Sequence, residues 1–110
     1  MREIKFRAWD KEDKKMFNIA RFDFADNTVY SHLFACDGYV GESLEIMQFS
    51  GLKDKNGISI YEGDILIDRH EEETGEAVFE NGSFFWETET FTQLLGEIND
   101  EIEVIGNVHE

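Results

Sequence analysis

Short stretches in which polar and apolar residues alternate open the chain, and this period of two is typical of half-buried strands. The alternation over residues 3–9 predicts a strand with one apolar face and one basic, aromatic face. The apolar face carries Ile4, Phe6 and Ala8, and the other face carries Lys5, Arg7 and Trp9. A charged turn over residues 10–14 is expected to return the chain as a second strand over residues 15–20.

Turn residues recur at short intervals in the next segment. Strands are predicted over residues 21–24 and 28–32, on either side of a turn at residues 25–27. Residues 33–42 contain two glycines and no clear period, so we expect them to be irregular. This part of the chain is expected to add β-hairpins to the fold.

Two Asn-Gly pairs in the second part of the chain are hairpin signals, because a type I′ turn needs positive φ at both of its central residues. Asn56-Gly57 is expected to reverse the chain after a strand over residues 44–49. Glu62-Gly63-Asp64 is then expected to bend it into a strand over residues 64–70. Residues 71–75 are expected to form an acidic, exposed connection.

Asn81-Gly82 predicts a register as well as a hairpin, because a two-residue loop fixes which residues of its two strands lie opposite each other. On the face expected to be buried, Phe79 lies opposite Phe84 and Ala77 opposite Trp86; on the other face, Val78 lies opposite Phe85 and Glu76 opposite Glu87. The two opposed glutamates repel each other, so their end of the hairpin must be exposed or meet a cation.

Residues 90–97 are the best helix candidate, since Thr90 can cap the helix and Gly96 can end it. The apolar face of this helix would consist of Phe91, Leu94 and Leu95. A closing strand is expected over residues 101–108, interrupted at Gly106-Asn107. Together these elements predict a mainly β (α+β) fold. Residues 1–110 would be one domain, with an N-terminal β layer over about residues 1–43 and a small SH3-like barrel over about residues 44–110.

Charge is unevenly distributed along the chain, whose formal net charge is −15. Residues 1–21 contain seven basic and four acidic residues, whereas the rest of the chain has three basic residues against twenty-one acidic ones. No lysine or arginine follows Arg69. Such a surface repels phosphate backbones, so nucleic-acid binding by the chain as a whole is disfavoured and basic partners are favoured.

Cysteine content and the length of the apolar runs indicate in which compartment the protein is expected. Cys36 is the only cysteine, so no internal disulfide forms. The first residues lack a signal-peptide core, and no apolar run reaches the roughly 20 residues that a spanning helix needs. We therefore expect a soluble, cytoplasmic protein that makes no contact with membranes.

Metal-binding and catalytic motifs are weak. Asp54-Lys55-Asn56-Gly57 superficially resembles an EF-hand loop, but its glycine comes two places early and Ile65 stands where the twelfth-position glutamate is needed. The other metal-ligand types are dispersed: His32, Cys36, His70 and His109. Cys36 lacks a nearby basic residue, and no serine lies in a nucleophile elbow. We predict no enzymatic activity, no metal and no cofactor.

Two small groups of residues are candidate partner-binding sites. The basic, aromatic combination of Lys5, Arg7 and Trp9 is of a type that stacks bases or grips phosphate, although these side chains would more simply face water or pair with local acids. The second group is Tyr61, Glu62 and Asp64. Paired carboxylates are a general acid–base device, but Asp64 more simply braces the turn at Gly63 by accepting backbone N–H groups.

Four blocks of the sequence together resemble the YopX family of bacteriophage and prophage proteins. They are MREIKFRAWDKEDKKMF, MQFSGLKDKNGISIYEGDIL, VFENGSFFWE and EVIGNVHE, in that order along nearly the whole chain. The resemblance implies a phage or prophage origin and an SH3-like barrel in the C-terminal part. It implies no established activity and supplies no catalytic residues, and it lapses around residues 22–41.

Size, charge and the lack of a catalytic constellation lead to one functional hypothesis and two alternatives. The hypothesis is a non-enzymatic module with an acidic surface that binds a protein partner, with homo-oligomerisation through exposed strand edges as a further expectation. One alternative is a nucleic-acid-binding accessory protein that uses Lys5, Arg7 and Trp9. The other is a small-molecule or hydrolase site built on clustered carboxylates.

Overall fold

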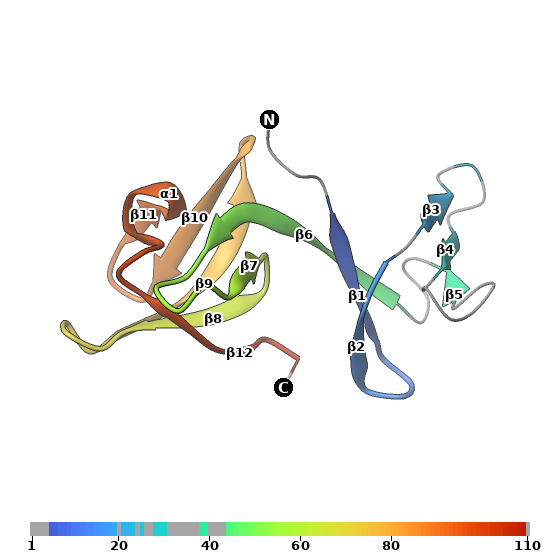
Figure 1. Ribbon diagram of the computed structural model, residues 1–110, viewed down its shortest axis with the longest axis horizontal. Coiled ribbons are helices and arrows are strands. Elements are labelled where there is room, and N and C mark those ends of the chain that lie inside the picture. Colours follow the sequence, from blue (N-terminus) through green and yellow to red (C-terminus); the bar gives the residue numbers. More distant parts are fainter. Residues whose placement is uncertain are drawn as a thin grey trace. The chain divides into compact units, whose positions relative to one another are not determined.

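The computed structural model describes residues 5–19, 21–23, 25, 28–30, 38–39 and 44–109. The chain divides into two compact units. The N-terminal unit comprises Ile4–Gln48, and the C-terminal unit comprises Phe49–Glu110 together with Met1–Glu3. The described elements of both units are mostly strands (Figure 1). Nowhere in the described ranges is a helix long and apolar enough to cross a bilayer.

The described elements of the N-terminal unit are antiparallel strands: β1 (Phe6–Asp10), β2 (Lys15–Asn18), β3 (Arg21–Asp23), β4 (Thr28–Tyr30), β5 (Gly38–Tyr39) and the first half of β6 (Leu44–Lys53). β1 pairs with β2 and β6, and β4 pairs with β3 and β5. The predicted charged turn joins β1 to β2, and the Asp10 carboxylate accepts two backbone N–H groups within it. Ala8 is fully buried, as predicted for the apolar face of this strand. Ile4 and most of the predicted irregular segment, residues 33–42, lie outside the described residues.

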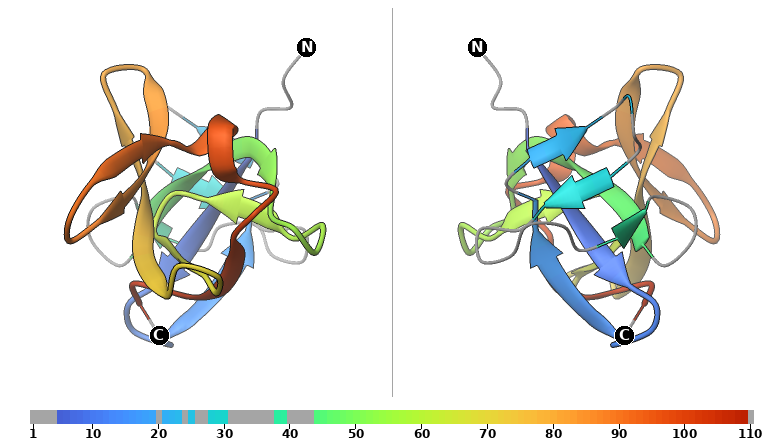
Figure 2. Two further views of the ribbon diagram at one scale, coloured as in Figure 1. Left: turned by 90° about the vertical axis from the view of Figure 1, so that its left-hand side faces the viewer. Right: turned by 90° about the vertical axis from the view of Figure 1, so that its right-hand side faces the viewer.

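A five-stranded antiparallel sheet with the order β11-β10-β9-β8-β12 forms the larger part of the C-terminal unit. Its strands are β8 (Asp64–Asp68), β9 (Glu73–Glu80), β10 (Ser83–Thr88), β11 (Thr92–Leu94) and β12 (Glu103–Asn107). The second half of β6 pairs with β7 (Ser59–Tyr61), and Figure 1 shows both strands crossing one face of this sheet. The curled antiparallel sheets form a half-barrel (Figure 2), which confirms the expected SH3-like, mainly β fold with a short helix.

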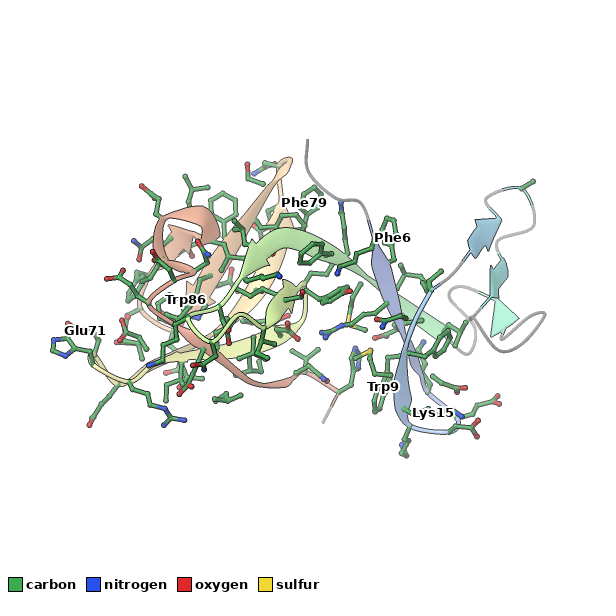
Figure 3. All side chains as sticks on the ribbon, viewed as in Figure 1. Phe6, Trp9, Lys15, Glu71, Phe79 and Trp86 are labelled. Atoms are coloured by element: carbon green, nitrogen blue, oxygen red, sulfur yellow. The ribbon has the colours of Figure 1, made fainter. Side chains whose placement is uncertain are left out.

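The core of the C-terminal unit lies between these two sheets. It is a cluster of buried side chains: Ile60, Leu66, Ala77, Phe84, Trp86, Leu95, Ile98 and Ile102. Trp86 is completely buried among the strands (Figure 3), and its Nε1–H donates a hydrogen bond to the Leu66 carbonyl at 3.2 Å. A buried indole needs such an acceptor, so this bond removes the cost of placing the largest core residue there.

The second Asn-Gly hairpin is confirmed in turn and in register. Asn81 and Gly82 both have positive φ, 50° and 82°, as a type I′ turn requires. The strand pairs are those predicted: Phe84 with Phe79, Trp86 with Ala77, Phe85 with Val78 and Glu87 with Glu76. The two-residue loop therefore determines which side chains of β9 and β10 face the core.

The first Asn-Gly pair reverses the chain, but the prediction of a type I′ turn there is wrong. Gly57 has a φ of 81°, whereas Asn56 is not left-handed. The Gly57 N–H donates to the Asp54 carbonyl at 3.0 Å, and the Asp54 N–H donates to the Ile58 carbonyl at 2.8 Å. The loop is therefore one residue longer than a two-residue hairpin and has glycine at its single left-handed position.

Asp54 explains this turn, because its buried carboxylate organises the backbone on both sides. Oδ1 accepts the N–H groups of Asn56 and Ile58, each at 2.8 Å, and Oδ2 accepts the N–H of Val104 at 2.9 Å. The Lys55 N–H also donates to the Ile102 carbonyl at 3.0 Å. We call these four bonds the Asp54 clamp: two of them hold the β6–β7 turn itself, and the bonds to Ile102 and Val104 tie it to the start of β12.

The predicted helix over residues 90–97 is mostly wrong. The chain turns at Thr88, whose Oγ1 accepts the N–H groups of Thr90 and Phe91, and residues 92–94 then pair with β10 as β11. Only α1 (Leu95–Ile98) is helical, and it has no side-chain cap. The helical period was outweighed by strand pairing, which a local pattern does not show.

The predicted exposed connection over residues 71–75 is also partly wrong. β8 ends at Asp68, and β9 already begins at Glu73. Gly75 lies buried within β9, opposite Thr88 of β10. The acidic residues at the tip of the β8–β9 hairpin, such as Glu71, are exposed as expected (Figure 3). The closing strand β12 has its irregularity between Val104 and Gly106, just before the predicted interruption.

Candidate functional site

The run Tyr61-Glu62-Gly63-Asp64 is built into the fold. Asp64 is 1% exposed, and its Oδ2 accepts the Tyr61 N–H at 2.8 Å, so it braces this turn as predicted. The Tyr61 ring is buried against Phe49, with ring centroids 5.4 Å apart. Gly63 donates its N–H to the Ala77 carbonyl and accepts the Val108 N–H, both at 2.8 Å. Of the three site candidates in this run, Glu62 alone presents a partly exposed side chain.

Lys5 directly precedes β1, and Arg7 and Trp9 lie within this strand. All three are half-buried, and each interacts with other residues of the chain. Arg7 lies opposite the buried Met47 of β6, and Trp9 opposite Glu45. These three residues therefore do not stand out as an open basic strip, and their binding of phosphate stays a prediction.

The register of β6 with β7 shifts between Phe49 and Lys53, which marks a bulge in β6. A shallow groove of about 300 Å³ opens in the C-terminal unit between this β6 bulge, the β9–β10 turn and the end of β11. Its lining consists of Ser50, Gly51, Leu52, Gly82, Ser83, Phe84, Leu94 and Gly96. The Ser50 Oγ accepts the Leu52 N–H at 3.1 Å, which holds the bulge in shape. Serine hydroxyls are present in this lining and carboxylates are not, so the groove does not supply the paired acids that a carboxylate hydrolase needs.

The surface of the main sheet that faces away from the core carries a more specific arrangement. We give the name outer face to the part of this surface formed by Glu76, Val78 and Glu80 of β9, Ser83, Phe85 and Glu87 of β10, and Thr92 and Leu94 of β11; beyond it, Ile65 of β8 lies opposite Glu76. The strand registers arrange these residues in three rows across the strands: Glu80 and Ser83; Val78, Phe85 and Leu94; and Glu76, Glu87 and Thr92. An apolar row is thus flanked by carboxylates on both sides.

Exposure differs along the apolar row. Leu94 is 44% exposed, and Val78 and Phe85 are half-buried. Leu94 also lines the groove, so the row and the groove meet at this residue. The sequence predicts the Val78–Phe85 and Glu76–Glu87 pairs, but it places Leu94 on a helix and so misses the third residue of the row.

Negative charge accumulates at the edge of the outer face. Burial, the opposed Glu87 and the nearby Glu62 raise the pKa of the Glu76 carboxyl, in that order of importance, and His109 acts in the opposite direction. Among the described residues, no lysine or arginine forms an ion pair with Glu76 or Glu87. The outer face therefore has carboxylates whose mutual repulsion a cation from a partner would relieve.

Replacing Glu76 by glutamine is expected to stabilise the protein at neutral pH. The folded state holds the Glu76 proton more tightly than the unfolded state does, so this contribution to stability is present at low pH and is lost as the pH rises through the range between the ordinary and the raised pKa. The gain should be about 0.5 kcal/mol at about pH 7 and should vanish at about pH 4, after allowing for solvent screening. Thermal unfolding at both pH values measures it, with Glu89→Gln in an exposed turn as the control; an equal gain for the two variants would contradict the explanation.

A different carboxylate, Glu103, is already satisfied. It accepts hydrogen bonds from Arg69 Nε and, at 3.0 Å, from Asn56 Nδ2, and these bonds lower the pKa of its carboxyl. This pair joins the end of β8 to β12 beside the Asp54 clamp. The negative charge of Glu103 is therefore paired with Arg69 within the chain, whereas Glu76 and Glu87 form no such pair with a described lysine or arginine.

Metal ligands do not converge in the part of the chain that the structure describes. No three His, Cys, Asp or Glu side chains among those residues are grouped so that they could hold a metal ion. His32, Cys36 and Ser43 lie outside the described residues. The Asp54 run, which superficially resembles a calcium loop, uses its carboxylate for backbone N–H groups.

Comparison with known proteins assigns the family. The family model described as YopX protein matches residues 5–110. The chain belongs to the YopX family. The crystal structure of protein EF1440 from Enterococcus faecalis is similar to this YopX-family chain, with 32% sequence identity and a TM-score of 0.74. The match covers 100% of this chain and 96% of that one, and no curated protein matches the chain.

Proposed function

We propose that this YopX-family protein is a non-enzymatic module that binds a basic protein partner. The outer face carries the proposal, because it combines an apolar row with flanking carboxylates, of which Glu76 and Glu87 form no ion pair with a described lysine or arginine. The surrounding unit is itself strongly acidic: residues 49–110 contain sixteen acidic and three basic residues, a net charge of −13. Complementary charge of this kind steers a basic partner to its site and rejects acidic ones.

The alternatives have less support from the described residues. The same carboxylates would repel a nucleic acid, and Lys5, Arg7 and Trp9 are half-buried. A gel shift with single- and double-stranded DNA at low salt tests the nucleic-acid alternative directly. The carboxylate-hydrolase alternative requires a pocket with converging acids, which the groove at the β6 bulge does not supply. Of the candidates Tyr61, Glu62 and Asp64, we propose only Glu62 as a contact for the partner, because it lies near Glu76.

The setting of this function is also a proposal. We infer a phage or prophage origin and action in the cytoplasm of a bacterial host, on the basis of the four sequence blocks and the single cysteine. Self-association through a strand edge is a further proposal, since β11 and β12 are the edges of the main sheet. Size-exclusion chromatography with light scattering tests it.

Charge reversal on the outer face should abolish recognition of basic segments. We expect the double variant Glu76→Lys/Glu87→Lys to bind basic, apolar peptides of about 18 residues at least about tenfold more weakly than the parent, because both flanking charges of one row change sign. Fluorescence anisotropy with labelled peptides measures the affinity. The probes are a set of synthetic peptides that share apolar content and differ in net charge from acidic to basic.

The matched control is Glu71→Lys/Glu72→Lys, which makes the same change in net charge at the exposed tip of the β8–β9 hairpin. Figure 3 shows Glu71 at this tip, away from Trp86 and Phe79. Equal loss of affinity in the two double variants would mean that net charge alone attracts the peptides. If acidic and basic peptides bind the parent equally, the proposal of a basic partner is wrong.

A further inference from the structure

We propose that the partner segment which docks on the outer face is an amphipathic basic helix, lying across β9, β10 and β11 along the apolar row. This inference rests on the proposed function and adds the shape and direction of the ligand. It follows from the spacing of the three rows, from the exposure along them and from their charge.

The spacing of the rows sets the footprint. Neighbouring strands lie about 4.8 Å apart, so the row of Val78, Phe85 and Leu94 runs about 10 Å across three strands. Alternate residues along a strand are about 6.8 Å apart, so Glu76 and Glu80 lie at about that distance on either side of Val78. Glu87 extends the carboxylate row on one side to β10. The footprint is a narrow apolar strip with acids along both sides.

A helix matches this footprint. Residues three or four apart on a helix are about 5–6 Å apart along one face, which is close to the distance between neighbouring strands. A helix about 10 Å wide would cover the apolar row, and Lys or Arg side chains on both sides of its apolar stripe would reach the two carboxylate rows. Their long aliphatic stems would lie over Val78 and Phe85 while their charged ends meet Glu76, Glu80 and Glu87.

An extended segment fits less well. Laid along β9, it could place alternate residues over Glu76, Val78 and Glu80, but it would leave Leu94 on β11 uncovered. Leu94 is the most exposed residue of the row at 44%, so the largest gain in apolar burial lies at the end that such a segment does not reach. A ligand that follows the row, rather than the strands, covers all three apolar residues.

A second copy of this chain is also a poor occupant. Two outer faces brought together would oppose Glu76, Glu80 and Glu87 with the same residues of the other copy, and opposed like charges are destabilising. The repulsion between the paired Glu76 and Glu87 would be reinforced in such a dimer and relieved beside a basic helix. Electrostatic repulsion therefore disfavours a second copy of the chain and favours a basic helix as the ligand of the outer face.

Three synthetic peptides of about 18 residues, five turns of helix, test the inference on the full chain. The first has a leucine stripe at helical spacing with lysines on both sides. The second has the same composition with leucine and lysine alternating, as on a strand. The third is the first with every lysine replaced by glutamate. Anisotropy or calorimetry at moderate salt measures the affinities.

We expect the helical peptide to bind at least about tenfold more tightly than the alternating peptide, with no binding of the acidic one. Equal binding of the helical and alternating peptides would contradict the inference that the partner segment is a helix, but it would still support the proposal of a basic partner. If neither basic peptide binds, the proposed function fails as well. Chemical shifts that move in residues of the outer face on titration, and not at the β8–β9 tip, would support the site.

Single substitutions provide the second measurement. Leu94→Ser removes an exposed apolar side chain from the row. It should weaken binding of the helical peptide about tenfold while leaving the thermal midpoint of the protein close to that of the parent. Ile105→Ser is the matched control, because Ile105 is similarly exposed, 49%, but lies on β12. An equal effect of the two variants, or none from Leu94→Ser, would place the peptide elsewhere and overturn the inference.

Discussion

Replacement of Asp54 by asparagine is expected to lower the free energy of unfolding by about 3 kcal/mol. Both carboxylate oxygens accept backbone N–H groups, Oδ1 from Asn56 and Ile58 and Oδ2 from Val104. An asparagine has one acceptor oxygen, so its NH₂ group must face at least one backbone donor. Because the site is 5% exposed, water cannot replace the lost acceptor. Urea unfolding at about pH 7 measures the loss.

Asp68 provides the control for this variant. It also accepts two backbone N–H groups, from His70 and Glu71, but it does so with Oδ1 alone and in an exposed turn. An amide oxygen can keep both bonds, so Asp68→Asn should change stability by less than about 0.5 kcal/mol. Similar losses at the two positions would show that the second oxygen of Asp54 contributes little.

Replacement of Gly75 by alanine should have an effect of similar size, for a steric reason. A Cβ at this position would lie 2.5 Å from the Glu87 carbonyl oxygen and 2.9 Å from both the Glu87 carbonyl carbon and Thr88 Cγ2. Two of these atoms belong to the backbone of β10, so β9 and β10 would have to separate. We expect a loss of about 3 kcal/mol in the free energy of unfolding, at the upper end for an inserted methyl group.

Gly82→Ala separates this clash from the general cost of losing a glycine. Nothing lies within 4 Å of a Cβ added at Gly82, and the only penalty is its φ of 82°. That strain is worth about 1–2 kcal/mol. Denaturant unfolding of both variants should therefore rank Gly75→Ala as the less stable, and the opposite order would contradict the close approach of β9 and β10.

The parts of the fold that could be predicted depend on local rules. Asn81-Gly82 fixes a type I′ turn, and that turn alone assigns four cross-strand pairs and the inner and outer faces of β9 and β10. Alternation predicts β1, and the charged turn after it needs only the Asp10 side chain. In each case the cause lies within a few residues of its effect.

The errors arise where the cause is distant in the sequence. Asn56-Gly57 has the same residues as the second pair, but Asp54 reaches Val104 and selects a longer loop. Residues 92–94 have a helical pattern, but β10 offers them strand partners. Gly75 appeared to belong to a connection, whereas its close approach to Glu87 shows why β9 must contain a glycine there. Single-sequence patterns do not contain these partners.

The candidate site was predictable to the same degree. Pairing of Glu76 with Glu87 follows from the hairpin register, and the need for a cation follows from the pairing. Leu94 could not be placed beside Phe85 without knowing β11. The eye-catching motif residues Tyr61 and Asp64 are buried and used by the fold, so the prominence of a motif is a poor guide to which side chains a partner can touch.

The Asp54 clamp has a consequence for synthesis on the ribosome. Asp54 and Val104 are 50 residues apart in the chain, and Asn56 is 47 residues from Glu103. The residues of the β6–β7 turn are therefore synthesised about fifty residues before Glu103 and Val104, and closing so large a loop is entropically unfavourable until the intervening sheet has formed. Closure of the half-barrel should therefore follow synthesis of residue 104, and ribosome-bound chains stalled before that residue should remain sensitive to proteases.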